Sequence, residues 1–247
     1  MTALGMLLLG FLLGIKHATE ADHLAAVATL ATRQASVGQT MRQGVAWGVG
    51  HSLTLLGLGG AMLWAGRPLP PVVAQGLELA VGAMLVALGL DVLRRLVRAR
   101  LHAHVHTHGD GIRHVHVHSH GGDVGLLRRP TAHRHSHSQR LPLRALTVGI
   151  MHGLAGSAAL ILLSLEAVQS FAMGMLYIVL FGVGSIVGMA LLSVAIAVPL
   201  RFSARSGAKL QGGLAVAVGA FSIGLGLVIL VDIGIVGGGF RALAGAA

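Results

Sequence analysis

The chain has 247 residues, of which 54% are hydrophobic and 11% are charged, whereas an average soluble domain carries about 25% charged residues. This composition excludes an ordinary soluble enzyme, and 37 glycines with only 4% aromatic residues are typical of closely packed transmembrane helices. A formal charge of +10 would suggest a nucleic-acid partner in a soluble protein, but here most basic residues lie in connections between apolar segments, so we expect no such partner. The absence of cysteine excludes disulfides and thiolate metal sites.

Six apolar segments predict an all-α integral membrane protein with about six transmembrane helices. The segments lie at residues 2–32, 41–65, 72–94, 145–165, 171–199 and 211–236. Each has at least 21 residues, which at about 1.5 Å per residue is long enough to cross a hydrocarbon core of about 30 Å. The first segment has 31 residues, too many for one straight span, so we expect it to be tilted or broken.

Basic residues are distributed very unevenly among the loops between these segments. Fifteen Lys and Arg residues lie in the loops after the first, third and fifth segments, and two, Arg67 and Arg241, lie on the opposite side. Because positively charged loops stay in the cytoplasm, we expect a multi-pass protein of the inner (plasma) membrane. Its long central loop would be cytoplasmic and both termini would lie outside.

The central loop divides the chain into a first membrane half, residues 1–97, the loop itself at 98–144, and a second membrane half, 145–247. Three short matches recur in the same order in both halves, at offsets of 135, 134 and 137 residues. They pair Gly14-Ile15-x-His17 with Gly149-Ile150-x-His152, Gly48-Val49-Gly50 with Gly182-Val183-Gly184, and Ala80-Val81-Gly82-Ala83 with Ala217-Val218-Gly219-Ala220. Three spans per half predict a 3+3 inverted repeat, the arrangement of many secondary transporters, whose substrate sites lie near the midplane.

Charged and metal-ligating side chains interrupt the first apolar segment between residues 16 and 23, in the sequence Lys-His-Ala-Thr-Glu-Ala-Asp-His. A charge at the centre of a bilayer helix costs about 2.5 to 3.5 kcal/mol on insertion scales, so this cluster requires an explanation. An internal ion pair between Lys16 and Glu20 is one interpretation, but it leaves Asp22 and two histidines unexplained. Imidazoles and carboxylates so close together are typical ligands of nickel, cobalt and zinc.

Helix geometry restricts which of these side chains reach one ion. At about 100° per residue, His17, Glu20 and His23 share a face of a straight helix, whereas Asp22 does not. Asp22 therefore requires local unwinding, for which Gly14 is a candidate weak point, or it acts through a neighbouring ligand or another span. His51 and His152 also lie inside apolar segments, and His152 is equally well explained as a structural hydrogen-bonding residue. The predicted metal set is His17, Glu20, Asp22, His23, His51 and His152.

Two of these motifs resemble a known family. His17-x4-Asp22-His23 resembles the HxxxxDH signature of the nickel/cobalt transporter family, and Gly50-His51-Ser52 is similar to the Gly-His-Ser/Thr signature of that family's following helix. The resemblance covers about residues 10–60, and the chain looks like a shorter, six-span relative of the urease-accessory membrane protein kind. It implies a carrier of Ni²⁺ or Co²⁺ in which His17, Asp22, His23 and His51 belong to the metal path.

Eleven histidines alternate with other residues in the central loop. They are His102, His104, His106, His108, His114, His116, His118, His120, His133, His135 and His137. In an extended backbone, residues i and i+2 point the same way, so each run would present a row of imidazoles to a divalent ion. Such a loop can buffer incoming metal or collect metal for export, and a solvated loop without a role is the alternative interpretation.

Together these patterns predict a secondary carrier of Ni²⁺ or Co²⁺ working in uptake, with Zn²⁺ as a further candidate. Two alternatives remain: an efflux carrier, and a membrane donor that hands metal to urease or hydrogenase maturation proteins. Neither a nucleotide-binding motif nor His-Glu-x-x-His is recognisable, so we expect neither an ATP-driven pump nor an enzyme, and no tightly bound cofactor. The expected partners are the lipid bilayer and divalent ions. Among the remaining acids, Glu78 is a candidate for the metal path, and Asp91 is expected to pair with Arg94 and Arg95.

Overall fold

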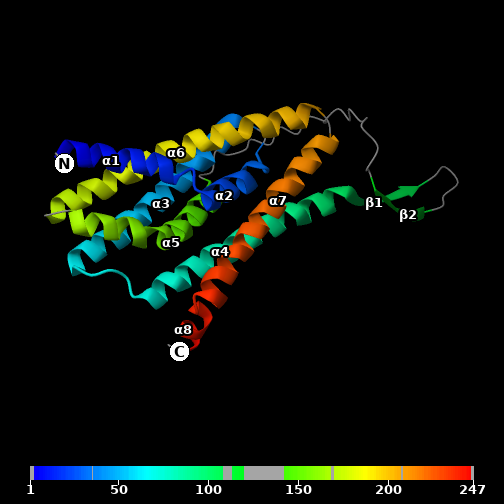
Figure 1. Cartoon of the computed structure of the whole chain (residues 1–247). Coiled ribbons are helices and arrows are strands. Elements are labelled where there is room, and N and C mark those ends of the chain that lie inside the picture. Colours follow the sequence, from blue (N-terminus) through cyan, green and yellow to red (C-terminus); the bar gives the residue numbers. More distant parts are fainter. Residues whose placement is uncertain are drawn as a thin grey trace.

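The computed structural model of the chain describes residues 3–34, 36–107, 113–119, 142–167, 170–206 and 208–245. In this part of the chain, an elongated bundle of helices carries a small β-hairpin at one end (Figure 1). The helices are α1 (Ala3–His17), α2 (Ala21–Ala31), α3 (Val37–Ala65), α4 (Pro71–Arg100), α5 (Leu143–Ala167), α6 (Phe171–Ser206), α7 (Ala208–Val231), the π-helix η1 (Asp232–Val236) and α8 (Gly239–Gly245), and the strands are β1 (Leu101–Thr107) and β2 (Arg113–Ser119).

The first apolar segment is broken, as its length predicts. Helices α1 and α2 meet at an angle of 54° across Ala18–Glu20. Thr19 closes the end of α1, because both its backbone N–H and its hydroxyl donate to the carbonyl of Lys16. Glu20 then adopts an extended conformation (φ −64°, ψ 151°) and its carbonyl accepts from Leu24 in the first turn of α2. The chain thus restarts as a helix with Asp22 and His23 at its beginning.

Each expected apolar segment is helical in the structure, but fewer than six helices have the length and composition of a membrane span. In the described ranges, Pro71–Arg98, Phe171–Ser203 and Lys209–Val236 are long and apolar enough to cross a membrane, and the bent pair α1 and α2 counts as a fourth. The second and fourth expected segments correspond to α3 and α5. The structure therefore supports a helical membrane protein with three or four such spans, while six is not established.

Helices from the two halves of the chain interleave. Helix α3 packs against α5 and α6, α1 lies along α6, and α4 lies along α7 (Figure 1). Glycines permit the closest approaches, because a Cβ on Gly50 would collide with the carbonyl oxygen of Leu146, and one on Gly184 with that of Phe11. Gly14 has the same role against the backbone of Phe181, so it is a packing residue and not the point at which the segment breaks.

An ionic cluster joins three helices near the hairpin end. Asp91 of α4 forms ion pairs with Arg33, which follows α2, with Arg95 one turn further along α4, and with Arg144 of α5. The expected ion pairing of Asp91 is therefore confirmed for Arg95. Its other two partners lie 58 and 53 residues away in the sequence, where local spacing offers no signal.

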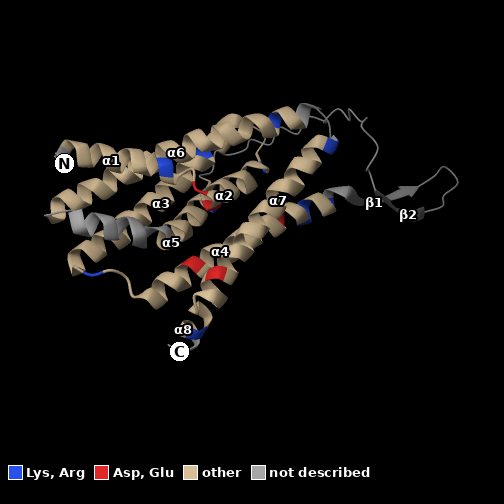
Figure 2. Cartoon of the chain, viewed as in Figure 1, with Lys and Arg blue, Asp and Glu red and all other residues tan. Residues whose placement is uncertain are grey.

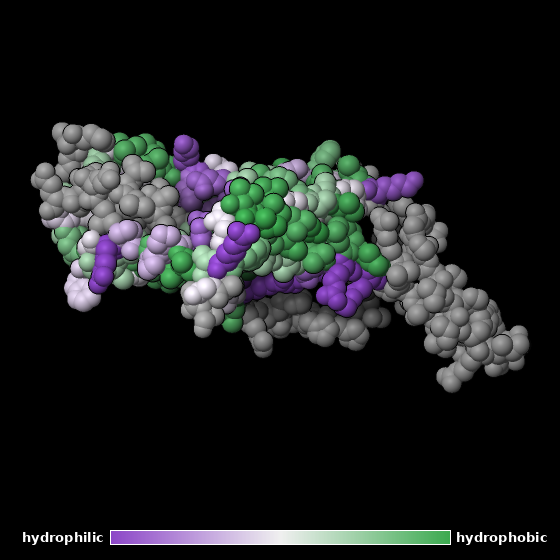
Figure 3. Space-filling model, turned by 60° about the horizontal axis from the view of Figure 1, so that its bottom comes forward, coloured by the Kyte–Doolittle hydropathy of each residue, from purple (hydrophilic) through white to green (hydrophobic). Residues whose placement is uncertain are grey.

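The outer surface of the bundle is largely apolar. Figure 3 shows broad hydrophobic areas, and large apolar side chains such as Trp64, Phe202 and Val236 are mostly exposed. Lys and Arg stand near helix ends and leave most of the helical surface uncharged (Figure 2). Because lipid solvates such a surface and water does not, the arrangement fits a membrane-embedded bundle.

Part of the histidine-rich loop has regular structure that the all-α expectation did not include. Strands β1 and β2 pair antiparallel, with His102, His104 and His106 opposite His118, His116 and His114, respectively. This register confirms an extended backbone for these six histidines. The remaining loop histidines, His108, His120, His133, His135 and His137, lie outside the described residues.

Candidate metal centre

Four histidines from four helices converge inside the bundle. His17 ends α1, His23 lies in the first turn of α2, His51 is in the middle of α3, and His152 is in α5. All four are at most 4% exposed. The ring centroids of His17 and His23 are 4.5 Å apart, those of His23 and His152 4.2 Å, and those of His17 and His51 5.2 Å. The break after His17 places His17 and His23 on facing sides of one small space.

Asp22 lies between two of these histidines. Its Oδ1 is 2.9 Å from Nδ1 of His23, and its Oδ2 is 2.8 Å from Nε2 of His152. An ionised carboxylate only accepts hydrogen bonds, so both of these ring nitrogens carry the proton and donate. This arrangement leaves Nε2 of His23 and Nδ1 of His152 with free lone pairs. A carboxylate that fixes the tautomer of a histidine in this way is typical of metal sites.

The free ring nitrogens have no hydrogen-bond partner in the described part of the chain. They include Nε2 of His17, Nε2 of His23, Nδ1 of His152 and both nitrogens of His51. Leaving one buried polar group unsatisfied costs about 1 to 3 kcal/mol, so such a concentration of unpaired nitrogens is unusual in a structure built for stability alone. The cluster has the chemistry of a cation site made chiefly of imidazoles.

The spacing of these atoms is close to that of a coordination sphere. One ligand atom each from His17, His23 and His51 lies within 4.8 Å of the others, and the same holds for Asp22, His23 and His152. Three ligand atoms bonded at about 2.1 Å to one ion and evenly spaced around it are at most about 3.6 Å apart. Pairs at the 4.8 Å limit would therefore have to approach each other by about 1.2 Å for the side chains to bind a common ion.

Glu20, the sixth residue of the predicted metal set, lies at the edge of the histidine cluster. Its Oε1 is 3.0 Å from Nδ1 of His17, but the side chain is 57% exposed and belongs to neither group of close ligand atoms. The alternative ion pair between Lys16 and Glu20 is not formed among the described residues. The other five predicted residues, His17, Asp22, His23, His51 and His152, are brought together.

Two aromatic residues in this site were missed by the sequence analysis. Trp47 stacks on His23 with a centroid distance of 6.0 Å and an interplanar angle of 13°, and Phe181 lies 5.4 Å from His17. Trp47 precedes His51 by four residues, which places both on the same face of α3. That spacing was the available signal for Trp47, whereas Phe181 comes from α6 and depends on tertiary packing.

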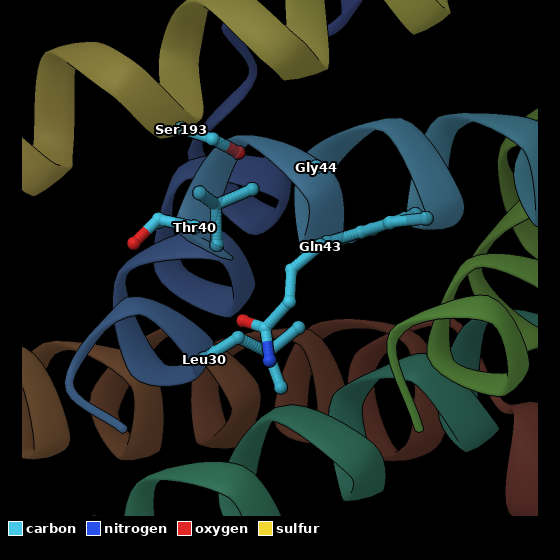
Figure 4. A pocket seen from close by; sticks show the side chains of 7 residues that line it. Leu30, Thr40, Gln43, Gly44 and Ser193 are labelled. Carbon is cyan, nitrogen blue, oxygen red and sulfur yellow. The ribbon is translucent and has the colours of Figure 1, made fainter. Parts of the chain in front are cut away.

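Two spaces flank the cluster on different sides. Asp22 and His152 line a cavity of about 300 Å³ that also includes Glu78. On the other side, Trp47 borders a narrow pocket between α2, α3 and α6, which has no room for a water molecule. Figure 4 shows the residues of this pocket, among them Thr40, Gln43 and Ser193. Oε1 of Gln43, Nε1 of Trp47 and Oγ of Ser193 are buried without a hydrogen-bond partner in the described residues.

Comparisons with known proteins point to metal transport. A family model described as NicO, high-affinity nickel-transport protein, matches residues 3–237. The chain is also similar to a urease accessory protein, UreH, of Bacillus sp. (strain TB-90), with 32% identity over 241 residues that cover 96% of each chain. No solved structure matches.

Proposed function

The chain belongs to the NicO family of high-affinity nickel-transport proteins, and from this premise we propose that it carries Ni²⁺ or Co²⁺ across a membrane by secondary transport in the direction of uptake. The observation that supports this proposal most is the cluster of four buried histidines with unpaired ring nitrogens around one space. Imidazole nitrogens suit divalent nickel and cobalt, and also zinc. A buried polar cluster in an apolar bundle is where a cation loses its water and changes sides.

In this proposal, His17, His23 and His51 bind the ion directly. Asp22 holds the tautomer of His23, and His152 holds Asp22 from the opposite half of the chain. Carboxylates that orient ligating histidines raise the basicity of the imidazole and fix its direction. Glu20, at the exposed edge beside His17, would contact the ion as it approaches or leaves.

We further propose that the two halves form a 3+3 inverted repeat of six spans. Paired contacts support it: the approach of Gly50 to Leu146 on α5 recurs as the approach of Gly184 to Phe11 on α1. The offsets within these pairs are 134 and 135 residues, the same as those of two of the three sequence matches. His17 and His152 are equivalent under the same relation, so each half contributes to the metal site.

The charge distribution supports a cytoplasmic location for the histidine-rich loop, with both termini outside the inner membrane. A loop in the cytoplasm can receive the metal after it crosses. The name of the urease accessory relative favours a second candidate function, in which the chain hands metal to urease or hydrogenase maturation proteins. Deleting residues 101–140 separates the two functions, because a donor loses activity whereas a carrier keeps its intramembrane site.

Nickel accumulation in cells tests the proposal. Cells expressing the wild type should accumulate radioactive nickel, while Asp22→Ala and His23→Ala should reduce accumulation to the level of cells without the protein. Thr29→Val is the matched control, because Thr29 is about as buried as His23 on the same helix but its hydroxyl donates only to the carbonyl of Ala26 in its own helix. Equal accumulation by all four strains would contradict the proposal. Lowered nickel accumulation and raised nickel tolerance in cells expressing the wild type would indicate efflux instead of uptake.

A further inference from the structure

A cavity of about 300 Å³ adjoins the histidine cluster between α2, α4, α5 and the end of α7. Its polar walls are Asp22, Glu78 and His152, and its apolar walls include Val81, Ile229 and Ile233. The carboxylate that bridges His23 and His152 therefore borders the same space as a second carboxylate from α4. The cavity connects the metal centre with Glu78.

Glu78 has no structural explanation in the bundle. It lies within the apolar span Pro71–Arg98 and forms no hydrogen bond or ion pair with any residue that the structure describes. A carboxylate inside a membrane span is costly, and such residues usually face a water-filled cavity or the path of an ion. Glu78 meets that description, because it lines a cavity that Asp22 also lines.

The π-helix η1 forms part of the wall of this cavity. Ile233 of η1 lines the cavity, and the N–H of Gly237 donates over five residues to the carbonyl of Asp232. Short π-helical turns often mark functional sites. Helix α4, which carries Glu78, contacts η1, which begins at Asp232. Figure 2 shows acidic positions side by side where α4 meets the end of α7.

The cavity is wide enough for an ion that keeps its water. At about 30 Å³ per water molecule, 300 Å³ corresponds to roughly ten water volumes, more than the roughly six waters around a hydrated divalent cation. The pocket behind Trp47, by contrast, does not admit water. Of these two spaces, the one beside Glu78 has room for a hydrated ion and the one beside Gln43 has none.

We propose that Glu78 is a capture ligand, which holds a hydrated divalent cation in this cavity before the ion loses water and passes to the histidines. The inference rests on the proposed transport function and adds to it a first binding step and a side of approach. Carboxylate oxygen suits a hydrated ion, while imidazoles bind it more tightly after dehydration. The site therefore works in two stages, with Asp22 at their boundary.

Glu78→Gln tests the capture step, because it keeps the size of the side chain and removes its charge. Initial rates of nickel uptake are measured against nickel concentration, together with nickel binding to the purified protein in detergent. We expect the apparent KM to rise about tenfold, with the maximal rate and the binding stoichiometry of the purified protein unchanged. Asp232→Asn is the control: it removes a charge from the same end but does not line the described cavity, so its KM should stay within about twofold of the wild type.

An unchanged KM in Glu78→Gln would overturn the role of Glu78, and so would an equal rise in Asp232→Asn, which would indicate a general surface charge effect. Failure of the proposed function is distinguishable, because the wild type itself would then transport no nickel.

The side of approach has a separate test that uses the absence of cysteine from the chain. Val81→Cys places a thiol on the wall of the cavity. A small, membrane-impermeant cationic methanethiosulfonate reagent should modify it from the side that also reaches Leu69→Cys in the connection between α3 and α4, and nickel should slow the reaction. In the Val81→Cys/Glu78→Gln double variant, nickel should protect less. Modification only from the side of Gln34→Cys would contradict the assignment.

Discussion

The carboxylate of Asp22 is 2.8 Å from Nε2 of His152, so the break in the first apolar segment is tied directly to a helix of the second half. The same carboxylate also contacts His23, its neighbour in sequence. One acidic side chain thus sets the proton positions of two buried histidines and joins the two halves at the metal centre. Any movement of one half against the other would act on this contact.

Asp22→Asn should lower nickel affinity about 10- to 100-fold, the usual effect of losing a residue that orients a metal ligand. His23 and His152 donate to different oxygens of Asp22, and in asparagine one of these oxygens is replaced by an NH2 group, which donates and cannot accept. Equilibrium dialysis of the purified protein measures the change. His152→Gln is the informative companion, because its amide nitrogen can take the place of Nε2 and still donate to Asp22. Affinity near that of the wild type supports a positioning role, whereas a loss as large as in His152→Ala would identify His152 as a ligand.

Gly50→Ala and Gly184→Ala should both destabilise the protein, because the added methyl group meets the backbone of Leu146 in one case and of Phe11 in the other. Overpacking of this kind costs about 1 to 3 kcal/mol. Gly57→Ala on the same helix as Gly50 is the control, since no atom lies near its added Cβ. Thermal unfolding in detergent should show lowered Tm values for the first two and not for the third. Unequal effects of the first two would argue against equivalent positions in an inverted repeat.

Single cysteines in this naturally cysteine-free chain should report its orientation. A membrane-impermeant maleimide added to intact cells should label Leu69→Cys. It should label Gln34→Cys and Leu210→Cys only after the membrane is opened. These positions lie in loops or at helix ends on opposite sides of the expected topology. Labelling of Gln34→Cys in intact cells would reverse the orientation, with the histidine-rich loop outside.

Ser193→Ala should raise or preserve the Tm while lowering the maximal rate of nickel uptake several-fold. The hydroxyl of Ser193 is buried without a partner in the described residues (Figure 4), so its removal relieves an unsatisfied group that costs about 1 to 3 kcal/mol. We expect the pocket that it shares with Gln43 to open as the second half of the path. Uptake at the wild-type rate would show instead that the pocket is a packing defect.

The sequence predicted most of the residues that meet at the candidate metal centre, but not the contacts among them. Five of its six candidate residues meet because burying charge inside an apolar segment is costly enough to mark functional residues individually. Which histidine Asp22 contacts was not predictable, since His152 is 130 residues away and reaches it only through the packing of α5. The break was expected near Gly14, but it lies at Ala18–Glu20, where Thr19 hydrogen-bonds back to α1.

Other features depended on surroundings that no local pattern encodes. Glu20 shares a helical face with His17 only if the helix is straight, and the break moves it to the edge of the site. The β-hairpin was foreseen only as extended backbone, because alternating histidines fix the spacing along a strand but not its pairing partner. Similarly, α3 is rich in glycine and polar residues, so its apolar segment indicated a helix more reliably than a membrane span.

Metal flux in proteoliposomes tests the central claim most directly. Purified wild-type protein and the His23→Ala variant are reconstituted into sealed vesicles, and the uptake of Ni²⁺, Co²⁺ and Zn²⁺ is followed with and without an imposed pH gradient. The account predicts saturable uptake of Ni²⁺ or Co²⁺ by the wild type and only passive leakage with His23→Ala. Equal flux in vesicles with either protein and in vesicles without protein would contradict it.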